Sequence, residues 1–196
     1  MKQLGFLVHL EKCLGCRSCE FACKNEHGQN DSFRRKIHSI DNAPKKTEQR
    51  FHHFSMSCNH CSNPACMASC PEMAIKKKAN GVVVIDQVKC TGCSHCVAAC
   101  PFDAISINVM TRKADKCDMC YDRQMQGHST ICVSSCPVHA IEIIDLHDPK
   151  NAHYERAVYG FDMKKMTNPS IRFSNDHQPP KQLFWSNTFM DEKENL

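Results

Sequence analysis

Apolar residues in this chain occur in short runs and alternations, which predict short strands rather than long helices. Residues 6–10 and 82–86 are apolar runs of strand length. Residues 75–86 predict a β-hairpin, because the dipeptide Asn80-Gly81 in their middle favours a tight two-residue turn. The longest apolar run, residues 82–85, is far shorter than the roughly 20 residues needed to cross a bilayer, so we expect no direct membrane span.

The segment 31–57 has a different pattern and is interpreted as an insertion. Residues 36–40 and 51–57 carry apolar side chains at alternating positions, notably Phe54 and Met56, which predicts a pair of strands. We expect the basic residues of this insertion to lie on solvated edges: Arg34, Arg35, Lys36, Lys45 and Lys46.

After Ile144 the pattern becomes irregular. Asp148-Pro149 reads as an N-cap followed by proline at the first helical position, which predicts a short helix ending near Val158. Asn168-Pro169 and Pro179-Pro180 then disfavour regular structure. Four aromatic residues are spread along this polar segment, and they could either cover their own domain or dock on a partner: Phe173, Phe184, Trp185 and Phe189.

Composition changes the picture, because 16 of the 196 residues are cysteine. A disulfide scaffold, zinc sites and iron–sulfur clusters are the three explanations to separate. No secretory signal is recognisable ahead of Cys13, so we expect the protein to be assembled where thiols stay reduced, which disfavours disulfides.

The cysteines form four groups of four, an internal repeat. The third group, within residues 90–101, has the C-x2-C-x2-C-x3-C-P spacing of bacterial ferredoxins, in which the fourth cysteine ligates the other cluster of a pair. The four motifs are Cys13, Cys16, Cys19 and Cys23; Cys58, Cys61, Cys66 and Cys70; Cys90, Cys93, Cys96 and Cys100; and Cys117, Cys120, Cys132 and Cys136. The phrase C-P-x-x-A-I follows motifs two, three and four, whereas Lys24 stands at the proline position after motif one. Each proline breaks a helical turn, and each Ala-Ile is expected to begin a strand.

The crossed ferredoxin pattern predicts how the cysteines share four [4Fe–4S] clusters. Only nineteen residues separate Cys70 from Cys90, so motifs two and three form one compact unit and motifs one and four pair around it. The predicted ligand sets are cluster 1, Cys13, Cys16, Cys19 and Cys136; cluster 2, Cys23, Cys117, Cys120 and Cys132; cluster 3, Cys58, Cys61, Cys66 and Cys100; and cluster 4, Cys70, Cys90, Cys93 and Cys96.

The predicted fold is therefore α+β: two nested bacterial-type ferredoxin-like units with an inserted strand pair and an irregular C-terminal tail. The predicted boundaries are 1–30 plus 110–145 for the outer unit, 31–57 for the insertion, 58–109 for the inner unit, and 146–196 for a C-terminal helix and partner-docking tail.

Zinc is the main alternative to iron–sulfur chemistry. Motif two or motif four alone could hold a tetrahedral zinc ion, but three cysteines within seven residues, as in motifs one and three, are a poor format for a closed zinc site. Thiolates suit both metals, so the spacing rather than the ligand type favours iron–sulfur clusters. A zinc-stapled interaction module stays the non-redox alternative.

No other chemistry is indicated. The net charge of +4 is mild and forms no basic helix face, so nucleic-acid binding is not supported. The chain has no Gly-rich phosphate loop and no nucleophile beside an evident base, and we expect it to move electrons without catalysing a reaction itself. His60, Lys89 and His95 could tune individual clusters, although solvent exposure is the simpler expectation for each.

The motifs resemble the four-cluster iron–sulfur subunits of molybdopterin-dependent membrane oxidoreductases, and most closely the electron-transfer subunit of the anaerobic dimethyl sulfoxide reductase family. The resemblance covers nearly the whole chain and is carried by residues 6–23, 32–35, 57–61, 81–84 and 116–123, with Pro64-Ala65-Cys66. Some relatives have tryptophan at the third cysteine of motif three and carry a three-iron cluster; Cys96 is present here, so four cubane clusters are expected.

This resemblance implies the nested ligand sets and a complex. Its partners would be a catalytic subunit carrying a molybdopterin cofactor and a membrane anchor that oxidises menaquinol. It implies membrane association through that anchor, on the extracytoplasmic face after co-export with the catalytic subunit, with the cytoplasmic face still open. The alternative is an iron–sulfur subunit of a formate dehydrogenase or hydrogenase complex, since such proteins use the same repeats.

Overall fold

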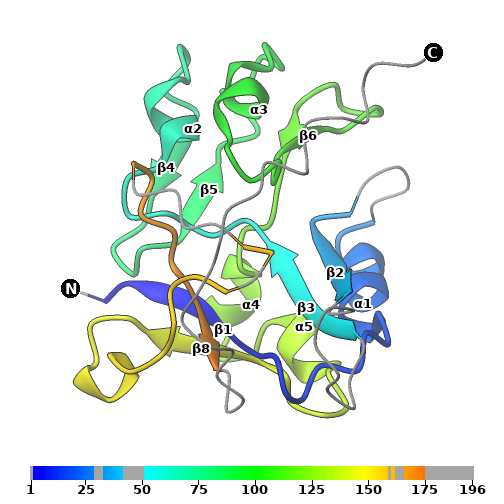
Figure 1. Cartoon of the computed structure of the whole chain (residues 1–196). Helices are drawn as coiled ribbons and strands as arrows, with labels where there is room; N and C mark the ends of the chain where they lie inside the picture. Colours follow the sequence, from blue (N-terminus) through cyan, green and yellow to red (C-terminus); the bar gives the residue numbers. More distant parts are fainter. Residues whose placement is uncertain (1, 29–32, 42–50, 159, 162–165, 175–196) are drawn as a thin grey trace, which may run out of the picture.

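The computed structural model describes residues 2–28, 33–41, 51–158, 160–161 and 166–174. Short helices and small sheets alternate along the chain, which confirms the predicted α+β class (Figure 1). In Figure 1, α2, α3, β4, β5 and β6 lie in the upper half of the molecule, and β1, β2, β3, β8, α1, α4 and α5 lie in the lower half. The predicted division into an outer and an inner unit stays a prediction.

A three-stranded sheet joins the two ends of the described chain. Its central strand, β1 (Leu4–His9), pairs antiparallel with β8 (Ile141–Asp145) and parallel with β9 (Ile171–Ser174). The sequence predicted β1 and a strand beginning at Ile141, but it missed β9. Ile171 and Phe173 are buried on one face of β9, so a two-residue alternation was the available signal, and it was too short to outweigh the preceding Asn168-Pro169.

The insertion forms the predicted strand pair. β2 (Arg35–Asp41) and β3 (Phe51–Ser57) run antiparallel, with Arg35 opposite Ser57 and Ile37 opposite Ser55. Phe54 is buried and packs edge-on against Phe173 of β9, with 6.0 Å between ring centroids. The ribbon is thereby anchored on the central sheet. Lys45 and Lys46 lie outside the described residues.

Two further hairpins separate the later motifs. β4 (Ile75–Lys77) and β5 (Val83–Ile85) form the predicted hairpin, and Gly81 at its tip has φ +86°. β6 (Ser106–Ile107) directly follows Ala104-Ile105, where a strand was expected to begin, and it pairs with β7 (Ala114–Asp115) in a second hairpin that the sequence did not predict. The side chain of Asn108 closes its turn by accepting hydrogen bonds from the backbone amides of residues 110 and 111.

The helices are short because proline or a turn ends each of them. They are α1 (Ser18–Glu26), α2 (Ala65–Ala68), α3 (His95–Ala99), α4 (Tyr121–Met125) and α5 (Ile131–Ser134). The helix predicted from Asp148 to Val158 is wrong: only a 3-10 turn, η1 (Pro149–Asn151), forms there. Asp148 caps it as expected, accepting from the amide of Lys150, but Glu155 then forms a β-bridge with Phe173 and the chain becomes extended.

Two apolar clusters form the core, and cysteines are part of both. The larger surrounds β1 and contains Phe6, Val8, Phe54, Phe161 and Phe173 beside four cysteines. The smaller lies between the two hairpins and contains Ile75, Val83 and Ile105 beside Cys66 and Cys96. Phe173 therefore covers its own domain, while Pro179-Pro180 and the aromatics Phe184, Trp185 and Phe189 lie outside the described residues.

Candidate metal centres

Each C-x-x-C loop turns through a left-handed residue just before its second cysteine. Gly15, His60, Gly92 and Met119 all have positive φ, at 66°, 43°, 75° and 58°. This conformation is strained for residues with a Cβ, and glycine supplies it freely in motifs one and three. At Gly92 the restriction is steric as well, since a Cβ would lie 2.0 Å from the carbonyl oxygen of Arg112. The four motifs thus share this backbone turn as well as the C-x-x-C spacing.

The repeated phrase C-P-x-x-A-I forms a turn that brings a backbone amide to the sulfur of its own cysteine. The residue before each alanine is left-handed, with φ of 47° at Met73, 50° at Asp103 and 49° at His139. The turn aims the alanine amide back at the cysteine: Ala74 N donates to Cys70 Sγ at 3.3 Å, and Ala140 N donates to Cys136 Sγ at 3.2 Å. An amide that donates to sulfur stabilises the thiolate form. The phrase therefore prepares these cysteines to act as anionic ligands.

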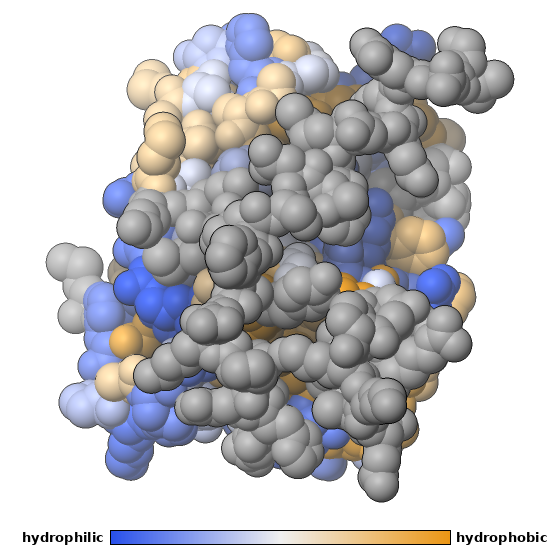
Figure 2. Space-filling model, in the orientation of Figure 1, coloured by the Kyte–Doolittle hydropathy of each residue, from blue (hydrophilic) through white to orange (hydrophobic). Residues whose placement is uncertain are grey.

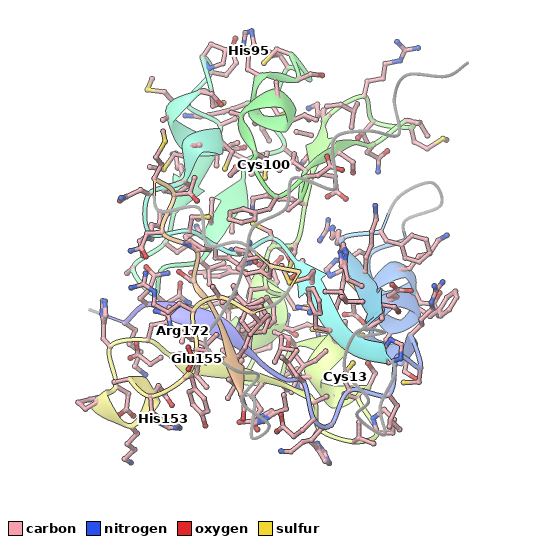
Figure 3. The ribbon with its side chains drawn as sticks, in the orientation of Figure 1. Cys13, His95, Cys100, His153, Glu155 and Arg172 are labelled. Carbon is pink, nitrogen blue, oxygen red and sulfur yellow. The ribbon has the colours of Figure 1, made fainter. Side chains whose placement is uncertain are left out.

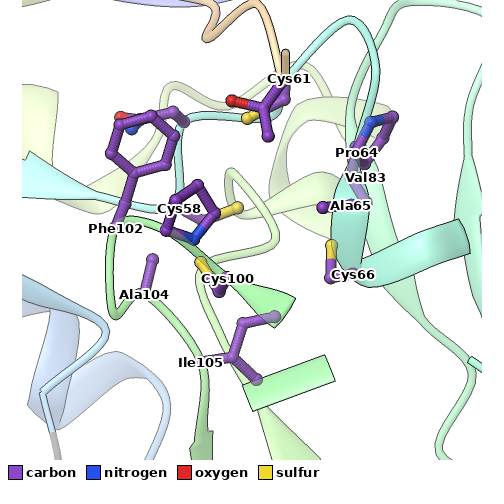
Figure 4. Close-up of a pocket in the computed structure, with 13 residues that line it drawn as sticks. Cys58, Cys61, Pro64, Ala65, Cys66, Val83, Cys100, Phe102, Ala104 and Ile105 are labelled. Atoms are coloured by element: carbon purple, nitrogen blue, oxygen red, sulfur yellow. The ribbon is translucent and has the colours of Figure 1, made fainter. Parts of the chain in front are cut away.

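Four cysteines from motifs two and three face one hollow. Cys58 and Cys61 on a loop, Cys66 on α2 and Cys100 after α3 line a space of about 360 Å³, its opening to solvent included, that Phe102 and Ile105 also border (Figure 4). Figure 4 shows the sulfur atoms of these four cysteines around the same space. Burial raises the pKa of the Cys61 thiol to about 11 and that of Cys66 to about 12.

A second hollow of similar size, about 320 Å³, is lined by the other four cysteines of motifs two and three. They are Cys70, Cys90, Cys93 and Cys96. Ile75 and Ile85 of the β4–β5 hairpin form its apolar wall. Cys93 is exposed, whereas Cys96 is buried on α3. The two hollows therefore each take three cysteines from one motif and one from the other.

The remaining eight cysteines, those of motifs one and four, act on one another's charge. Burial raises the pKa of the Cys13 thiol, and the nearby charges of Cys19, Cys136 and Cys16 raise it further. Burial raises the pKa of Cys23 to about 12, with additional contributions from Cys132 and Cys120. Cys117, whose thiol pKa is also shifted upward by burial, lies close to Cys23 and Cys132. Figure 3 labels Cys13 in the lower half of the molecule and Cys100 in the upper half.

Cysteines of different motifs are close enough for their charges to interact. The charge of Cys132 acts on Cys19, and that of Cys58 acts on Cys117. Cys66 and Cys70 belong to the two different hollows and are joined by α2 and the turn that follows it. The cysteines of motifs one and four therefore lie close to one another, and Cys117 lies close to Cys58 of the first hollow.

The donor set and the hollows fit [4Fe–4S] clusters. All sixteen thiols are free, and a buried thiol with a raised pKa becomes a thiolate at neutral pH only when a metal compensates its charge. A lone zinc ion would hold four sulfur atoms at about 2.3 Å from itself and leave no hollow between them. The hollows fit a cube with sulfur ligands at its corners instead.

A separate trio can be dismissed as an independent site. His27, Asp118 and Cys120 have ligand atoms within 4.8 Å of one another, and His27 Nε2 lies 3.6 Å from Cys120 Sγ. Cys120 already belongs to the group around Cys23, so the trio is the edge of that group.

Two expectations about charged residues are wrong. Arg35 is buried rather than solvated, and Arg34 is largely buried in ion pairs with Asp115 at 2.6 Å and Asp118 at 3.3 Å; Lys36 is exposed as expected. Strand alternation gives the reason, because β2 turns residue 35 inward and residue 36 outward.

His60 is also buried, whereas Lys89 and His95 are exposed. The Nδ1 atom of His60 accepts a hydrogen bond from the amide of Val83 at 3.0 Å. Burial holds the pKa of His60 well below the usual value, so the ring is neutral. The sequence offered no signal for this, since Val83 is 23 residues away in the chain.

The fold and the cysteine groups define an iron–sulfur protein of the ferredoxin type, with four [4Fe–4S] clusters. The family model of a 4Fe-4S dicluster domain matches residues 49–146. One relative is a chain of the anaerobic dimethyl sulfoxide reductase of Escherichia coli (strain K12). It is 36% identical over 178 residues, which are 86% of this chain and 87% of that protein.

Two other relatives are named for different sulfur compounds. The thiosulfate reductase electron transfer subunit of Salmonella typhi is 40% identical over 69% of this chain and 73% of its own length. A subunit of the tetrathionate reductase of Salmonella typhimurium is 38% identical over 74% of this chain and 59% of its own length. The chain therefore belongs to the family of iron–sulfur electron-transfer subunits of reductases such as anaerobic dimethyl sulfoxide reductase. Within the described residues, no helix has the length and apolar character needed to cross a membrane.

Proposed function

We propose that this chain relays electrons through its four [4Fe–4S] clusters, between a quinol-oxidising membrane anchor and a molybdopterin-containing catalytic subunit. The clusters supply reversible one-electron transfer when bound. The chain's own residues ligate them, insulate them and present the two ends of the series to partners. The relatives named as a reductase chain and as an electron transfer subunit support this role.

We propose the four ligand sets predicted from the sequence. The observation that carries them is the pair of hollows, each lined by three cysteines of one motif and one of the other. The charges of Cys19, Cys136 and Cys16 act on Cys13, which supports the cluster 1 set. Those of Cys132 and Cys120 act on Cys23, and those of Cys23 and Cys132 act on Cys117, which supports the cluster 2 set. Cys19 is acted on by Cys132 as well as by Cys136, so the two sets adjoin there.

Exposure supports the two ends of the relay. Among the sixteen cysteines only Cys16 and Cys93 are exposed, and they belong to the proposed clusters 1 and 4. An exposed apolar side chain lies near each of them. Leu14, 65% exposed, is two residues from Cys16 in the chain, and Met73, 74% exposed, lies between two residues that line the hollow containing Cys93. Figure 2 shows hydrophobic residues gathered over the part of the molecule that contains α2. Such patches suit docking of partner subunits, because little protein would then separate a cluster of this chain from a redox centre in the partner.

The same proposal places the protein at the membrane through its anchor, on the extracytoplasmic face. Protease treatment of cells, followed by detection of this chain, tests the side of the membrane. We expect the chain to be cleaved once the protease reaches the extracytoplasmic compartment, before the cytoplasmic membrane is broken.

The central test is composition and partnership. Anaerobic purification of the complex should yield about sixteen iron and about sixteen acid-labile sulfide per chain, together with a molybdenum-containing subunit. Half that iron, or stoichiometric zinc, would contradict the four-cluster relay. Co-purification with a hydrogenase large subunit would contradict the proposed reductase partner but not the proposed electron relay.

A further inference from the structure

Arg35 is the largest fully buried side chain described in the molecule, with 1% of its surface exposed. It is the first residue of β2 and lies opposite Ser57 of β3, and its guanidinium packs over Phe6 of β1. A buried charge is costly unless an opposite charge or strong hydrogen bonds compensate it. The environment of Arg35 should therefore contain a compensating group.

The direct contacts of Arg35 are all neutral. Its guanidinium donates to Ser55 Oγ at 3.0 Å, to Ser57 Oγ at 3.0 Å and to the carbonyl oxygen of Ser55 at 3.4 Å. It also lies over the ring of Phe6, 4.2 Å from the centroid, and its Nε has no hydrogen-bond partner. Among the described residues, no carboxylate lies within ion-pair distance of it. Arg34, by contrast, is paired with two aspartates.

The groups near Arg35 that become negative on metal binding are cysteines of two different proposed sets. Ser55 Oγ, which accepts from Arg35, lies 3.3 Å from Cys19 Sγ, so one hydroxyl connects the guanidinium to a proposed ligand of cluster 1. Burial by itself lowers the pKa of Arg35, but the charges of the nearby cysteines outweigh it and raise the pKa. Besides Cys19, these are Cys132, Cys117 and Cys23, proposed ligands of cluster 2. Arg35 thus lies between the two sets.

We propose that Arg35 is a buried positioning residue whose positive charge is shared by clusters 1 and 2 and raises their reduction potentials. The inference rests on the proposed ligand sets. Four thiolates give each site a net negative charge, and reduction adds another negative charge. A cation buried beside the site stabilises the reduced form more than the oxidised form, in a medium where charges interact more strongly than in water. Ser55 and Ser57 hold the cation without cancelling its charge.

The test compares three variants of the holoprotein in its complex. Arg35→Gln removes the charge and keeps hydrogen-bond donors, Arg35→Lys keeps the charge, and Lys36→Gln removes an exposed charge from the next position of the same strand. The readout is the midpoint potential of each cluster, from a potentiometric titration followed by electron paramagnetic resonance, with iron counted in each sample.

In Arg35→Gln we expect the midpoint potentials of clusters 1 and 2 to fall. At the wild-type midpoint the reduced-to-oxidised ratio of each should drop about tenfold, which is about 59 mV for a one-electron couple. Clusters 3 and 4 should shift less. Arg35→Lys should retain most of the wild-type potentials, and Lys36→Gln should leave all four unchanged, because an exposed charge is screened by solvent.

Unchanged potentials in Arg35→Gln at full iron content overturn the inference and leave the four-cluster relay standing. Low iron in the wild-type protein contradicts the relay instead. If Arg35→Gln fails to assemble, Arg35→Lys carries the test: full assembly with potentials near wild type supports a charge effect. Loss of iron in Arg35→Lys as well would show that the guanidinium shape is needed for packing, and would overturn it.

Discussion

At the scale of single residues, the buried cysteines are suited to act as metal ligands rather than as reactive thiols. Burial raises the pKa of most of them, for example to about 12 at Cys23 and Cys66. The exposed Cys16 is the exception, because the side-chain hydroxyl and backbone amide of Ser18 hydrogen-bond to its sulfur and lower its pKa. Ligation to iron replaces the missing stabilisation of the buried thiolates, and the N–H···S bonds of the C-P-x-x-A-I turns add to it.

Replacing one ligand should affect one cluster. We expect Cys96→Ser to perturb the cluster held with Cys70, Cys90 and Cys93, seen as the change of a single electron paramagnetic resonance signal, because Cys96 lines only that hollow. Cys66→Ser is the matched control: it occupies the equivalent place in motif two and should alter the other hollow's signal. Identical spectral changes in the two variants would contradict the ligand map.

A glycine in motif three provides a second test at this scale. In Gly92→Ala the new Cβ would meet the Arg112 carbonyl oxygen at 2.0 Å, so we expect iron loss from the cluster held by Cys90 and Cys93. Gly127→Ala is the control, since Gly127 has a similar positive φ of 81° but no atom within 4 Å of the added Cβ. It should cost about 1 kcal/mol, for the left-handed conformation alone, and retain its iron. Iron counted per chain separates backbone strain from steric clash. Equal iron in both variants would show that the contact is tolerated.

At the scale of elements, β9 completes the central sheet and thereby closes the larger core. Phe173 is fully buried between Phe54 of the insertion and Phe161, with ring centroids 6.0 Å and 5.2 Å away. β9 also forms the bridge to Glu155 that prevents the predicted helix. One short strand near the end of the described chain thus connects the N-terminal strand, the insertion and the segment after motif four.

Truncation of Phe173 should destabilise the holoprotein strongly. We expect Phe173→Ala to cost about 3–5 kcal/mol, because it removes a fully buried ring from the main core. The measurement is the denaturant concentration at which iron–sulfur absorbance is lost under anaerobic conditions. Met166→Ala, at a position 90% exposed, should change stability by no more than about 0.5 kcal/mol. A small effect of Phe173→Ala would mean that β9 contributes little to the core.

At the scale of the whole molecule, the clusters and the hydrophobic core are one structure. Cysteines belong to both apolar clusters, and every sheet in the described part of the chain is small. Metal ligation therefore substitutes for part of the hydrophobic core, as in other small metal-dependent folds. Removing the iron should remove the fold.

The resulting pH dependence has a definite sign. A thiol whose pKa lies above the working pH releases a proton when it binds iron, so the affinity for iron falls as the pH falls. Because burial raises these thiol pKa values, for example to about 11 at Cys61 and Cys120, protons compete with iron at every pH below about 11, and we expect iron loss to be faster at about pH 6 than at about pH 8. Visible absorbance and far-ultraviolet circular dichroism, followed together at constant ionic strength, should decay in parallel. Retention of secondary structure after complete iron loss would contradict the dependence of the fold on its clusters.

The sequence alone determined the features that depend on residues close together in the chain. Cysteine spacing indicates the chemistry, because a C-x-x-C loop needs only one turn of backbone to bring two sulfurs together. The Asn80-Gly81 turn and the alternation in residues 51–57 likewise predicted a hairpin and a strand correctly. The family phrases also lie in contiguous stretches, and the relatives bear them out.

Only the tertiary structure decided the features that depend on distant partners. Arg35 looks like part of a basic surface run until β3 and Phe6 cover it, and the buried His60 ring is held by a hydrogen bond from the amide of Val83. β9 exists because β1 offers it an edge, which local propensity does not encode. Burial and strand pairing are set by residues 20 or more positions away, and they determine which charges stay inside beside the clusters.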